Sequence, residues 1–434
     1  MKGNNILKSF LKYVSLNVFG MIGISCYILA DTYFVANGVG TDGLTALNLA
    51  LPIYGVINAT GLLIGIGGAT RYAILKAQGK IDLANKVFTQ AMQFGLLLGV
   101  IYTIIGLFGS TFLCRLLGAD EAIFALMNDY LKTIMCASPF FIMNNILIAF
   151  VRNDEAPRLS MMGMLIGSLV NIILDYIFIF PLQMGMFGAA FATGLAPVIS
   201  LGILSSHFIG KKNQLKLVKC KVKLATILDT CSLGLSSFVT ELSSGFVLLI
   251  FNMIILSLSG NLAVAAYGII ANISLVCLAI FTGIAQGIQP LISKYYGDED
   301  YKKVQQVFRY GAVLALVIGL ILYIGIFVFA DGLTAIFNKD QNRILAQMTI
   351  QGMHIYFIGI IFAGVNIVSA AYLCAIEKTR NGFLVSIIRG LILIVPFVIG
   401  LSLLFELNGV WLSFVCTEIL TCIIAIIFVR KSSL

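Results

Sequence analysis

The chain has few charged residues, only two histidines and a single tryptophan. Asp, Glu, Lys and Arg make up 11% of its 434 residues, whereas 60% of the residues are hydrophobic. Soluble globular domains have about 25% charged residues, and a soluble chain of this length could not bury so much apolar surface in its core. The composition therefore excludes a soluble protein and indicates a polytopic membrane protein.

The histidines and cysteines are too scattered for a metal or redox centre. None of the nine cysteines forms a Cys-x-x-Cys pair, and most of them lie within apolar runs, where a free thiol packs like a small hydrophobic side chain. Zinc and redox sites need clustered Cys or His ligands. We therefore expect no cofactor.

Long apolar runs occupy most of the chain. A helix needs roughly 20 mainly apolar residues to cross a bilayer, and the runs predict an all-α protein with twelve such spans. Their approximate positions are 14–38, 45–75, 88–117, 127–151, 158–181, 186–208, 227–258, 262–293, 306–337, 347–375, 382–405 and 408–430.

The net charge of +9 comes from an uneven distribution of Lys and Arg along the chain. If the N-terminus is cytoplasmic, all but four of the 28 Lys and Arg fall on the cytoplasmic side; the exceptions are Arg115, Lys132, Lys339 and Arg343. This positive-inside pattern predicts a multi-pass protein of the cell (inner) membrane with both termini in the cytoplasm. The basic residues suit contact with membrane lipids, and we expect no nucleic-acid partner.

The spans fall into two sets of six on either side of a basic segment. Landmarks recur in the second set at a nearly constant offset, as in Gly260, which lies 220 residues after Gly40. Because six is even, both sets have the same orientation, which predicts two six-helix lobes related by a pseudo-two-fold axis along the membrane normal. The predicted parts are an N-terminal lobe at 1–209, a cytoplasmic linker at 210–224 and a C-terminal lobe at 225–434.

Four acidic residues interrupt the apolar spans: Asp31, Asp175, Glu241 and Glu418. A charged side chain at the centre of a bilayer costs about 2.5–3.5 kcal/mol on insertion scales. None of the positions 220 or 221 residues away from these acids is acidic. The repeat therefore does not explain them, and we expect each to have a function of its own.

Two of these acids have a polar side chain one helical turn away. Tyr27 precedes Asp31 by four residues and Asn171 precedes Asp175 by four, so each pair shares a helix face. Lipid cannot satisfy such groups, so we expect them to turn into the helix bundle. An oxygen-only set of this kind can bind Na⁺ or retain a proton, because burial and a second carboxylate disfavour the charged form. Binding of Na⁺ and retention of a proton both stay open. The neighbouring spans contribute the further polar residues Asn145 and Thr193.

Several longer segments carry a resemblance to a known family. They are ILADTYFVANGVG in the first span, RNDEAPRLSMMGMLIGSLVNIILDYIFIF followed by GMFGAAFAT, and GVWLSFVCTEIL in the last span. These segments resemble the multidrug and toxic compound extrusion (MATE) transporters. The R-N-D-x-x-P form is most similar to the MepA-like branch, and the resemblance extends over nearly the whole chain.

The resemblance implies an antiporter that exports lipophilic, often cationic compounds in exchange for H⁺ or Na⁺ by alternating access, and we expect a monomer. It implies a cation-coupling site formed by Tyr27, Asp31, Asn145, Asn171, Asp175 and Thr193, with Na⁺ ligands at Asp31, Asn171 and Asp175 if the ion is Na⁺. Glu241 and Glu418 are expected as acids of the C-terminal lobe and the substrate cavity. The tenth span lacks the acid that some Na⁺-coupled members have there, which argues against a second Na⁺ site in the C-terminal half.

Two other functions remain open at this point. The same fold could move a lipid-linked glycan, but its pyrophosphate favours cationic residues in the cavity, and Arg389 is almost the only candidate in the spans. An intramembrane prenyl- or glycosyltransferase would also use buried acids, yet such enzymes need acid-rich Mg²⁺ motifs. Only the loop acids at 154–155 and 298–300 could supply one, so we do not expect an enzyme.

Overall fold

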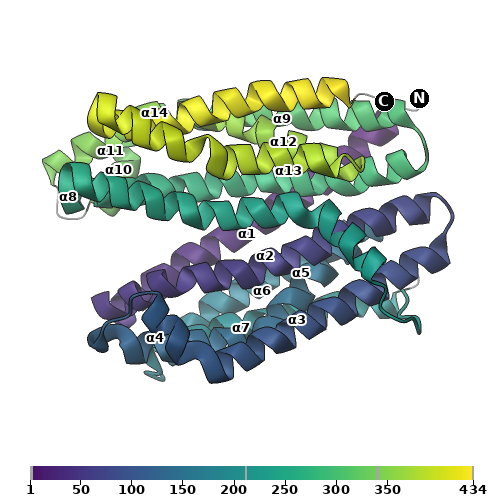
Figure 1. Cartoon of the computed structure of the whole chain (residues 1–434), viewed down its shortest axis with the longest axis horizontal. Helices are drawn as coiled ribbons and strands as arrows, with labels where there is room; N and C mark the ends of the chain where they lie inside the picture. Colours follow the sequence, from purple (N-terminus) through teal and green to yellow (C-terminus); the bar gives the residue numbers. More distant parts are fainter. Residues whose placement is uncertain (1–2, 211–212, 339–341, 433–434) are drawn as a thin grey trace. The chain divides into compact units, whose positions relative to one another are not determined.

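The computed structural model describes residues 3–210, 213–338 and 342–432, and nearly all of them are helical (Figure 1). Lys339, one of the four basic residues predicted outside the cytoplasm, lies outside the described residues, as do residues 211–212 of the linker. The helices are α1 (Gly3–Gly38), α2 (Thr41–Ala77), α3 (Ile81–Leu116), α4 (Glu121–Cys136), α5 (Ser138–Asn153), α6 (Pro157–Ile179), α7 (Gly185–Ser205), α8 (Leu224–Gly297), α9 (Tyr301–Val328), α10 (Ala330–Phe337), α11 (Arg343–Tyr356), α12 (Ile358–Ala375), α13 (Thr379–Ile387) and α14 (Ile394–Lys431). A 3-10 turn, η1 (Ser206–Ile209), follows α7, and a π-helical turn, η2 (Ile388–Ile392), joins α13 to α14.

These helices account for the twelve predicted spans. Nine helical stretches among the described residues are long and apolar enough to cross a membrane, and α4 with α5 forms a bent tenth. Two of the nine contain a break, at Gly260 in α8 and at Glu406 in α14, where the backbone leaves helical geometry. Both breaks fall between two predicted spans, so the prediction of an all-α, twelve-span protein is confirmed.

Four spans that we predicted as continuous helices are interrupted. The fourth, 127–151, consists of α4 and α5, which meet at a bend of 48°. Pro139 lies in the first turn of α5, and a proline ring clashes with the turn before it, so it kinks or breaks the helix at this place. The ninth and tenth predicted spans are divided without a proline at the junction, into α9 and α10 and into α11 and α12, and the eleventh is divided by the π-helical turn η2 into α13 and the start of α14.

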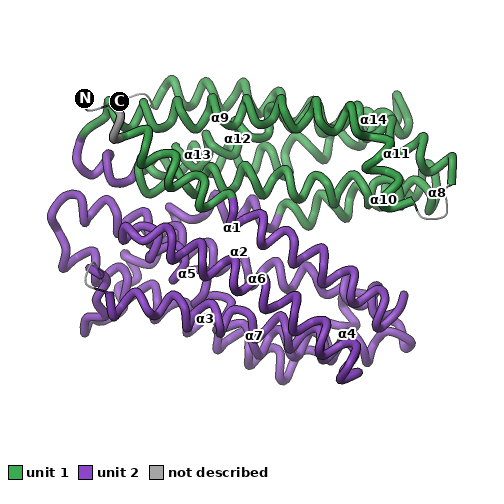
Figure 2. Tube along the Cα trace, turned by 180° about the vertical axis from the view of Figure 1, so that it is seen from behind, with its two compact units in different colours: residues 1–18, 243–292, 300–434 green, residues 19–242, 293–299 purple. Residues whose placement is uncertain are grey.

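The described helices pack into two compact units (Figure 2). Unit 2 comprises residues 19–242 and 293–299, so it contains α2–α7. Its core includes a cluster of buried aromatic rings in which Phe150 lies 5.7 Å from Tyr72 and 5.0 Å from Phe88 between ring centroids. Such rings fill the space between helices and add favourable edge contacts to their burial.

Unit 1 comprises residues 1–18, 243–292 and 300–434. Its core includes the fully buried Trp411, whose ring lies 6.0 Å from that of Tyr267. The first part of α1 thus packs with unit 1, and the first part of α8, residues 224–242, packs with unit 2. These segments occupy equivalent places in the two halves of the repeat. The lobe boundaries drawn at the linker describe that repeat and stay a prediction.

Glycines allow α2 and the first part of α8 to touch through their backbones within unit 2. A Cβ atom added to Gly67 would lie 1.9 Å from the carbonyl oxygen of Thr230, and one added to Gly234 would lie 1.9 Å from that of Leu63. Small residues are the usual means of close helix approach in membranes. The crossing therefore depends on glycine at both positions.

The linker is an extended strap that is bonded to α3. The backbone N–H groups of Lys216, Val218 and Lys223 donate to the side-chain oxygens of three buried residues of α3, at distances of 3.0, 3.0 and 2.8 Å. The acceptors are Asn85, Thr89 and Gln90. Unpaired backbone groups are costly where water is excluded, so these polar side chains replace the hydrogen bonds that a helix or strand would provide.

Asp154, at the end of α5, is the common hydrogen-bond partner of several segments of unit 2. Its Oδ1 accepts from Tyr72 (2.8 Å) and Lys76 (2.6 Å), and its Oδ2 lies 2.8 Å from His207 Nε2 and accepts from the Gln214 N–H at 2.9 Å. Burial alone would raise the pKa of Asp154, but the hydrogen bonds from His207, Lys76 and Gln214 lower it to about 2. This carboxylate therefore ties α2, η1 and the linker together.

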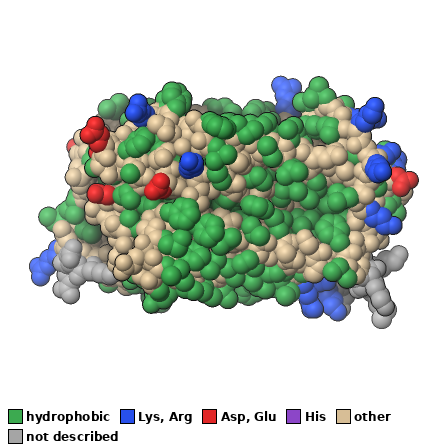
Figure 3. All heavy atoms as spheres, turned by 90° about the horizontal axis from the view of Figure 1, so that it is seen from below, with side chains coloured by type: hydrophobic (Ala, Val, Ile, Leu, Met, Phe, Trp, Pro, Cys, Tyr) green, Lys and Arg blue, Asp and Glu red, His purple; other side chains and the backbone are tan. Residues whose placement is uncertain are grey.

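The outer surface matches the surroundings of a membrane protein. In Figure 3, apolar side chains cover the middle of the visible face, whereas most charged side chains lie toward its two ends. Along α3 the exposed residues include Leu97, Ile104, Phe108 and Phe112, and Phe108 is 86% exposed. A band of this kind is stable only in contact with lipid.

We predict that Gly67→Ala destabilises the protein. Its Cβ would overlap the backbone of α8, and overpacking of this kind costs about 1–3 kcal/mol. Thermal unfolding of the purified protein in detergent measures the effect. Gly202→Ala on α7 is the matched control, because open space surrounds that position, and we expect its Tm to remain unchanged or to rise slightly. An equal effect of the two substitutions would contradict the backbone contact.

We also predict that Asp154→Asn lowers the free energy of unfolding at pH 7 by about 3 kcal/mol, because it breaks a buried ion pair and leaves Lys76 without its partner. The neighbouring Glu155→Gln is the control. Its ion pair with Lys294 is about half exposed on both sides, so its loss costs less than about 1 kcal/mol.

The pH dependence of this difference has a definite sign. The pKa of Asp154 is lower in the folded protein, at about 2, than its ordinary value of 3.8. The carboxylate therefore contributes its full stability above pH 3.8 and loses it as the pH falls toward 2. A gap in Tm between Asp154→Asn and the parent that widened on acidification would refute this account.

Candidate functional site

The central feature of unit 2 is a pair of facing acids, Asp31 on α1 and Asp175 on α6. Asp175 is 0% exposed and Asp31 is 9% exposed, and their carboxyl groups are close enough to interact electrostatically. Within the described part of the chain, no other residue donates a hydrogen bond to Oδ1 of Asp31 or to either oxygen of Asp175. Two carboxylates in such surroundings cannot both keep their charge unless a proton or a cation neutralises one of them.

A short polar chain continues from the acid pair to α7. Asn171 lies one turn before Asp175 and donates through Nδ2 to Oγ1 of Thr193 at 3.3 Å. Thr193 in turn donates to the carbonyl oxygen of Ala189 at 3.0 Å. The Oδ1 atom of Asn171 is buried and receives no donor from the described residues, so it adds another acceptor beside the carboxylates.

The acid pair is composed of the atoms that a hard monovalent cation prefers. Buried carboxylate and amide oxygens without donors are suitable Na⁺ ligands, and they are supplied by Asp31, Asn171 and Asp175. No group of three or more His, Cys, Asp or Glu able to hold a metal occurs among the described residues. The set therefore fits a proton or a Na⁺ ion. That these residues bind the coupling ion stays a prediction.

Three tyrosines adjoin the acids, and the sequence had indicated only one of them. The hydroxyl of Tyr27 lies 3.0 Å from that of Tyr54 on α2. Tyr130 on α4 is buried and close enough to interact electrostatically with both Asp31 and Asp175. The helical spacing of Tyr130 relative to the buried Met127 and Ile134 indicates a core position, but spacing alone does not show which acids it meets.

Asn145 belongs to a second network rather than to the acid pair. Its Nδ2 donates to Oδ1 of Asn58 at 2.8 Å, and Asn58 donates to Oε1 of Glu241 at 2.7 Å. Glu241 had been grouped with the acids of the C-terminal lobe, but the structure places it in unit 2, bonded to α2. An amide can reorient to donate or accept, so this chain gives Glu241 a neutral partner.

Glu418, the fourth acid, has charged and neutral partners within unit 1. Its Oε1 accepts from Nε of Arg389 at 2.6 Å, and its Oε2 accepts from Nδ2 of Asn366 at 2.7 Å. Glu418 is 1% exposed. Because both oxygens are engaged, Glu418 is not free to bind a substrate cation in this arrangement.

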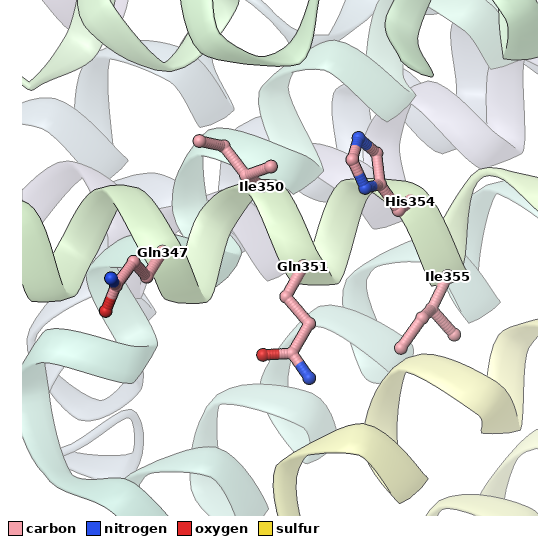
Figure 4. A pocket seen from close by; sticks show the side chains of 5 residues that line it. All are labelled: Gln347, Ile350, Gln351, His354 and Ile355. Carbon is pink, nitrogen blue, oxygen red and sulfur yellow. The ribbon is translucent and has the colours of Figure 1, made fainter.

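A shallow surface hollow on α11 contains none of these acids. It is lined by Gln347, Ile350, Gln351, His354 and Ile355 (Figure 4). The side chains come from one helix and point in different directions along it rather than toward a common centre. His354 stacks on Phe327 with 4.1 Å between ring centroids, so this hollow has no convergent polar groups and is a poor candidate for a binding site.

Comparison with known proteins identifies the scaffold that carries these acids. The MatE family profile matches residues 17–177 and 236–399, which include both members of the acid pair and most of the helices α1 and α6 that carry them. The chain belongs to the MatE family. It is therefore a multi-pass membrane protein of the MATE multidrug efflux transporters.

Similar MATE proteins match over nearly their whole length. The multidrug export protein MepA of Staphylococcus saprophyticus is 26% identical over 435 residues, which cover 98% of this chain and 94% of that protein. MepA of Staphylococcus aureus is 26% identical, with 98% and 93% covered. The resemblance predicted from the sequence is thus confirmed.

Solved structures of MATE transporters have the same fold. A multidrug resistance MATE transporter of the MOP superfamily, in its outward-facing conformation, matches with a TM-score of 0.91 at 23% identity and covers 98% of this chain and 95% of its own. A crystal structure of MATE in complex with MaL6 matches with a TM-score of 0.93 at 23% identity and the same coverage.

Proposed function

We propose that this MATE protein is a secondary active antiporter that exports lipophilic, often cationic compounds in exchange for H⁺ or Na⁺. The observation that carries the proposal is the pair of buried carboxylates of Asp31 and Asp175, which lack other donors among the described residues. The MepA relatives, which are named multidrug export proteins, support a drug-like cargo. We further propose a monomer in the cell membrane with cytoplasmic termini, as the distribution of Lys and Arg predicts.

The acids would couple the two fluxes through their charge. When a proton or Na⁺ neutralises Asp31 and Asp175, the lobe no longer attracts a cationic substrate, and the helices that carry the acids can repack. When the ion leaves, the negative charge returns and the next substrate cation binds more tightly. Two ligands that compete for one charge are coupled reciprocally, which is the requirement for exchange. The tyrosines and Asn171 would limit the access of water to the carboxylates.

The lipid-linked glycan that we considered as cargo has no observation in its favour. A pyrophosphate needs free cationic side chains, and Arg389 is paired with Glu418. A transferase is equally unsupported, because the oxygens of Asp154 are occupied by protein partners and are not open to Mg²⁺. We therefore propose no enzymatic activity.

Efflux from proteoliposomes with separately imposed pH and Na⁺ gradients tests the proposal. We expect Asp31→Asn and Asp175→Asn each to reduce gradient-driven ethidium transport by about tenfold or more, because each removes a carboxylate that binds the coupling ion. A tenfold loss corresponds to about 1.4 kcal/mol of free energy. If the acids share one ion, the double variant loses no more than either single variant, because residues that act as a unit are not additive. The gradient that drives the wild-type protein identifies the ion.

Asp42→Asn is the matched control, because this acid lies in the first turn of α2 and is exposed. Its transport rate should equal that of the wild type. Unchanged gradient-driven transport in both Asp31→Asn and Asp175→Asn would refute the coupling role. The Tm of each variant, measured in parallel, separates a loss of coupling from a loss of fold.

A further inference from the structure

Unit 1 contains a buried acid whose oxygens are arranged differently from those of Asp31 and Asp175. Glu418 on α14 is held from two directions: Arg389 donates to Oε1 at 2.6 Å, and Asn366 on α12 donates to Oε2 at 2.7 Å. Asn366 also donates to the backbone carbonyl of Glu418 at 2.9 Å. The carboxylate is therefore neutralised by the protein itself and needs no external ion.

The arginine of this ion pair lies in an irregular part of the backbone. Arg389 lies in the π-helical turn η2, in which the N–H of Leu393 donates to the carbonyl of Ile388 at 3.0 Å. Single π-helical turns inside α-helices are rare and occur frequently at functional sites. The turn also packs closely on α8, because a Cβ at Gly390 would lie 2.4 Å from the side chain of Ser243.

Oxygen atoms without donors lie close to the same carboxylate. Oδ1 of Asn366 belongs to the amide that bonds Glu418, and Thr421 follows Glu418 by one helical turn on the same face. Both oxygens are buried and receive no hydrogen bond from the described residues. A carboxylate, an amide oxygen and a hydroxyl are together the donor set that small monovalent metal ions use.

We propose that the guanidinium of Arg389 is a tethered cation that takes the place of a small monovalent metal ion beside Glu418, and that its removal opens a latent site for such an ion formed by Glu418, Asn366 and Thr421. The side chain takes the place that a Na⁺ ion would take, so this site does not exchange ions during transport. Given the function proposed above, ion coupling is then confined to Asp31 and Asp175. The latent site itself does not depend on that function.

A purely structural ion pair leads to a different expectation. If the pair only stabilised the bundle, loss of Arg389 would leave a buried carboxylate that becomes protonated, because an unpaired charge is costly there. Stability would then fall, but Na⁺ would have no specific effect. A tethered cation in an ion site predicts instead that its removal allows Na⁺ to bind.

The test uses full-length protein in which Asp31→Asn and Asp175→Asn remove the N-terminal acids, so that they contribute no Na⁺ effect. The Tm in NaCl is compared with the Tm in choline chloride at equal ionic strength. We expect Arg389→Gln to gain a Na⁺-dependent rise in Tm on the order of 2 °C, as a ligand that binds only the folded state produces. The rise should disappear when Glu418→Gln is added.

Two matched variants check the origin of the effect. Arg389→Lys keeps the positive charge and should show no Na⁺ dependence. Arg309→Gln makes the same substitution at an exposed position of α9 and should also show none. A folded Arg389→Gln protein without a Na⁺ effect, or with one that persists in the Glu418→Gln double variant, overturns the proposal.

The protein that retains Arg389 provides a second test, which does not require the Arg389→Gln variant to fold. With the N-terminal acids neutralised and Arg389 present, the Tm should be the same in NaCl and choline chloride. A Na⁺-dependent rise that Glu418→Gln abolishes would show that the site binds ions despite Arg389 and would overturn the proposal. Because the readout is Tm, it remains valid even if transport proves independent of Asp31 and Asp175.

Discussion

A charge or hydrogen-bonding group without a partner is costly inside a lipid bilayer, and this constraint governs both the fold and the sites. It makes every span helical, since a helix satisfies its own backbone. Outside the spans, where the linker is not helical, side chains such as Asn85 and Thr89 accept hydrogen bonds from its backbone. The same constraint explains why each buried acid must be considered together with its partners.

The acids satisfy this constraint in different ways. Glu418 is neutralised by a guanidinium, whereas Glu241 accepts a hydrogen bond from the neutral amide of Asn58. Asp31 and Asp175 face each other with no other donor among the described residues. A site that must exchange its cation has to leave the charge unsatisfied by the protein, whereas a site with a resident cation cannot exchange it. The contrast between these arrangements supports our proposal that the pair exchanges ions and that Glu418 does not.

Some features of the fold follow from the sequence with little ambiguity. Hydropathy predicts the spans because the cost of polar groups in lipid is large and local, and even the break of α8 at Gly260 falls between two predicted spans. The bend between α4 and α5 escaped this approach, because an apolar run stays apolar across a proline. Pro139 marks the bend, but a proline alone does not locate a break, because Pro52 and Pro197 lie inside the continuous helices α2 and α7.

The sequence by itself determined the membrane class, the spans, the family resemblance and the expectation that Asp31 and Asp175 are functional, because composition, spacing and motif are local properties. Only the tertiary structure decided the partners: Tyr130 beside the acid pair, Asn145 with Asn58 rather than with the acids, and the ion pair of Glu418. Partners come from helices far apart in the sequence, and the rotation of each helix in the bundle selects them. That rotation depends on the packing of the whole unit, so no single segment contains it.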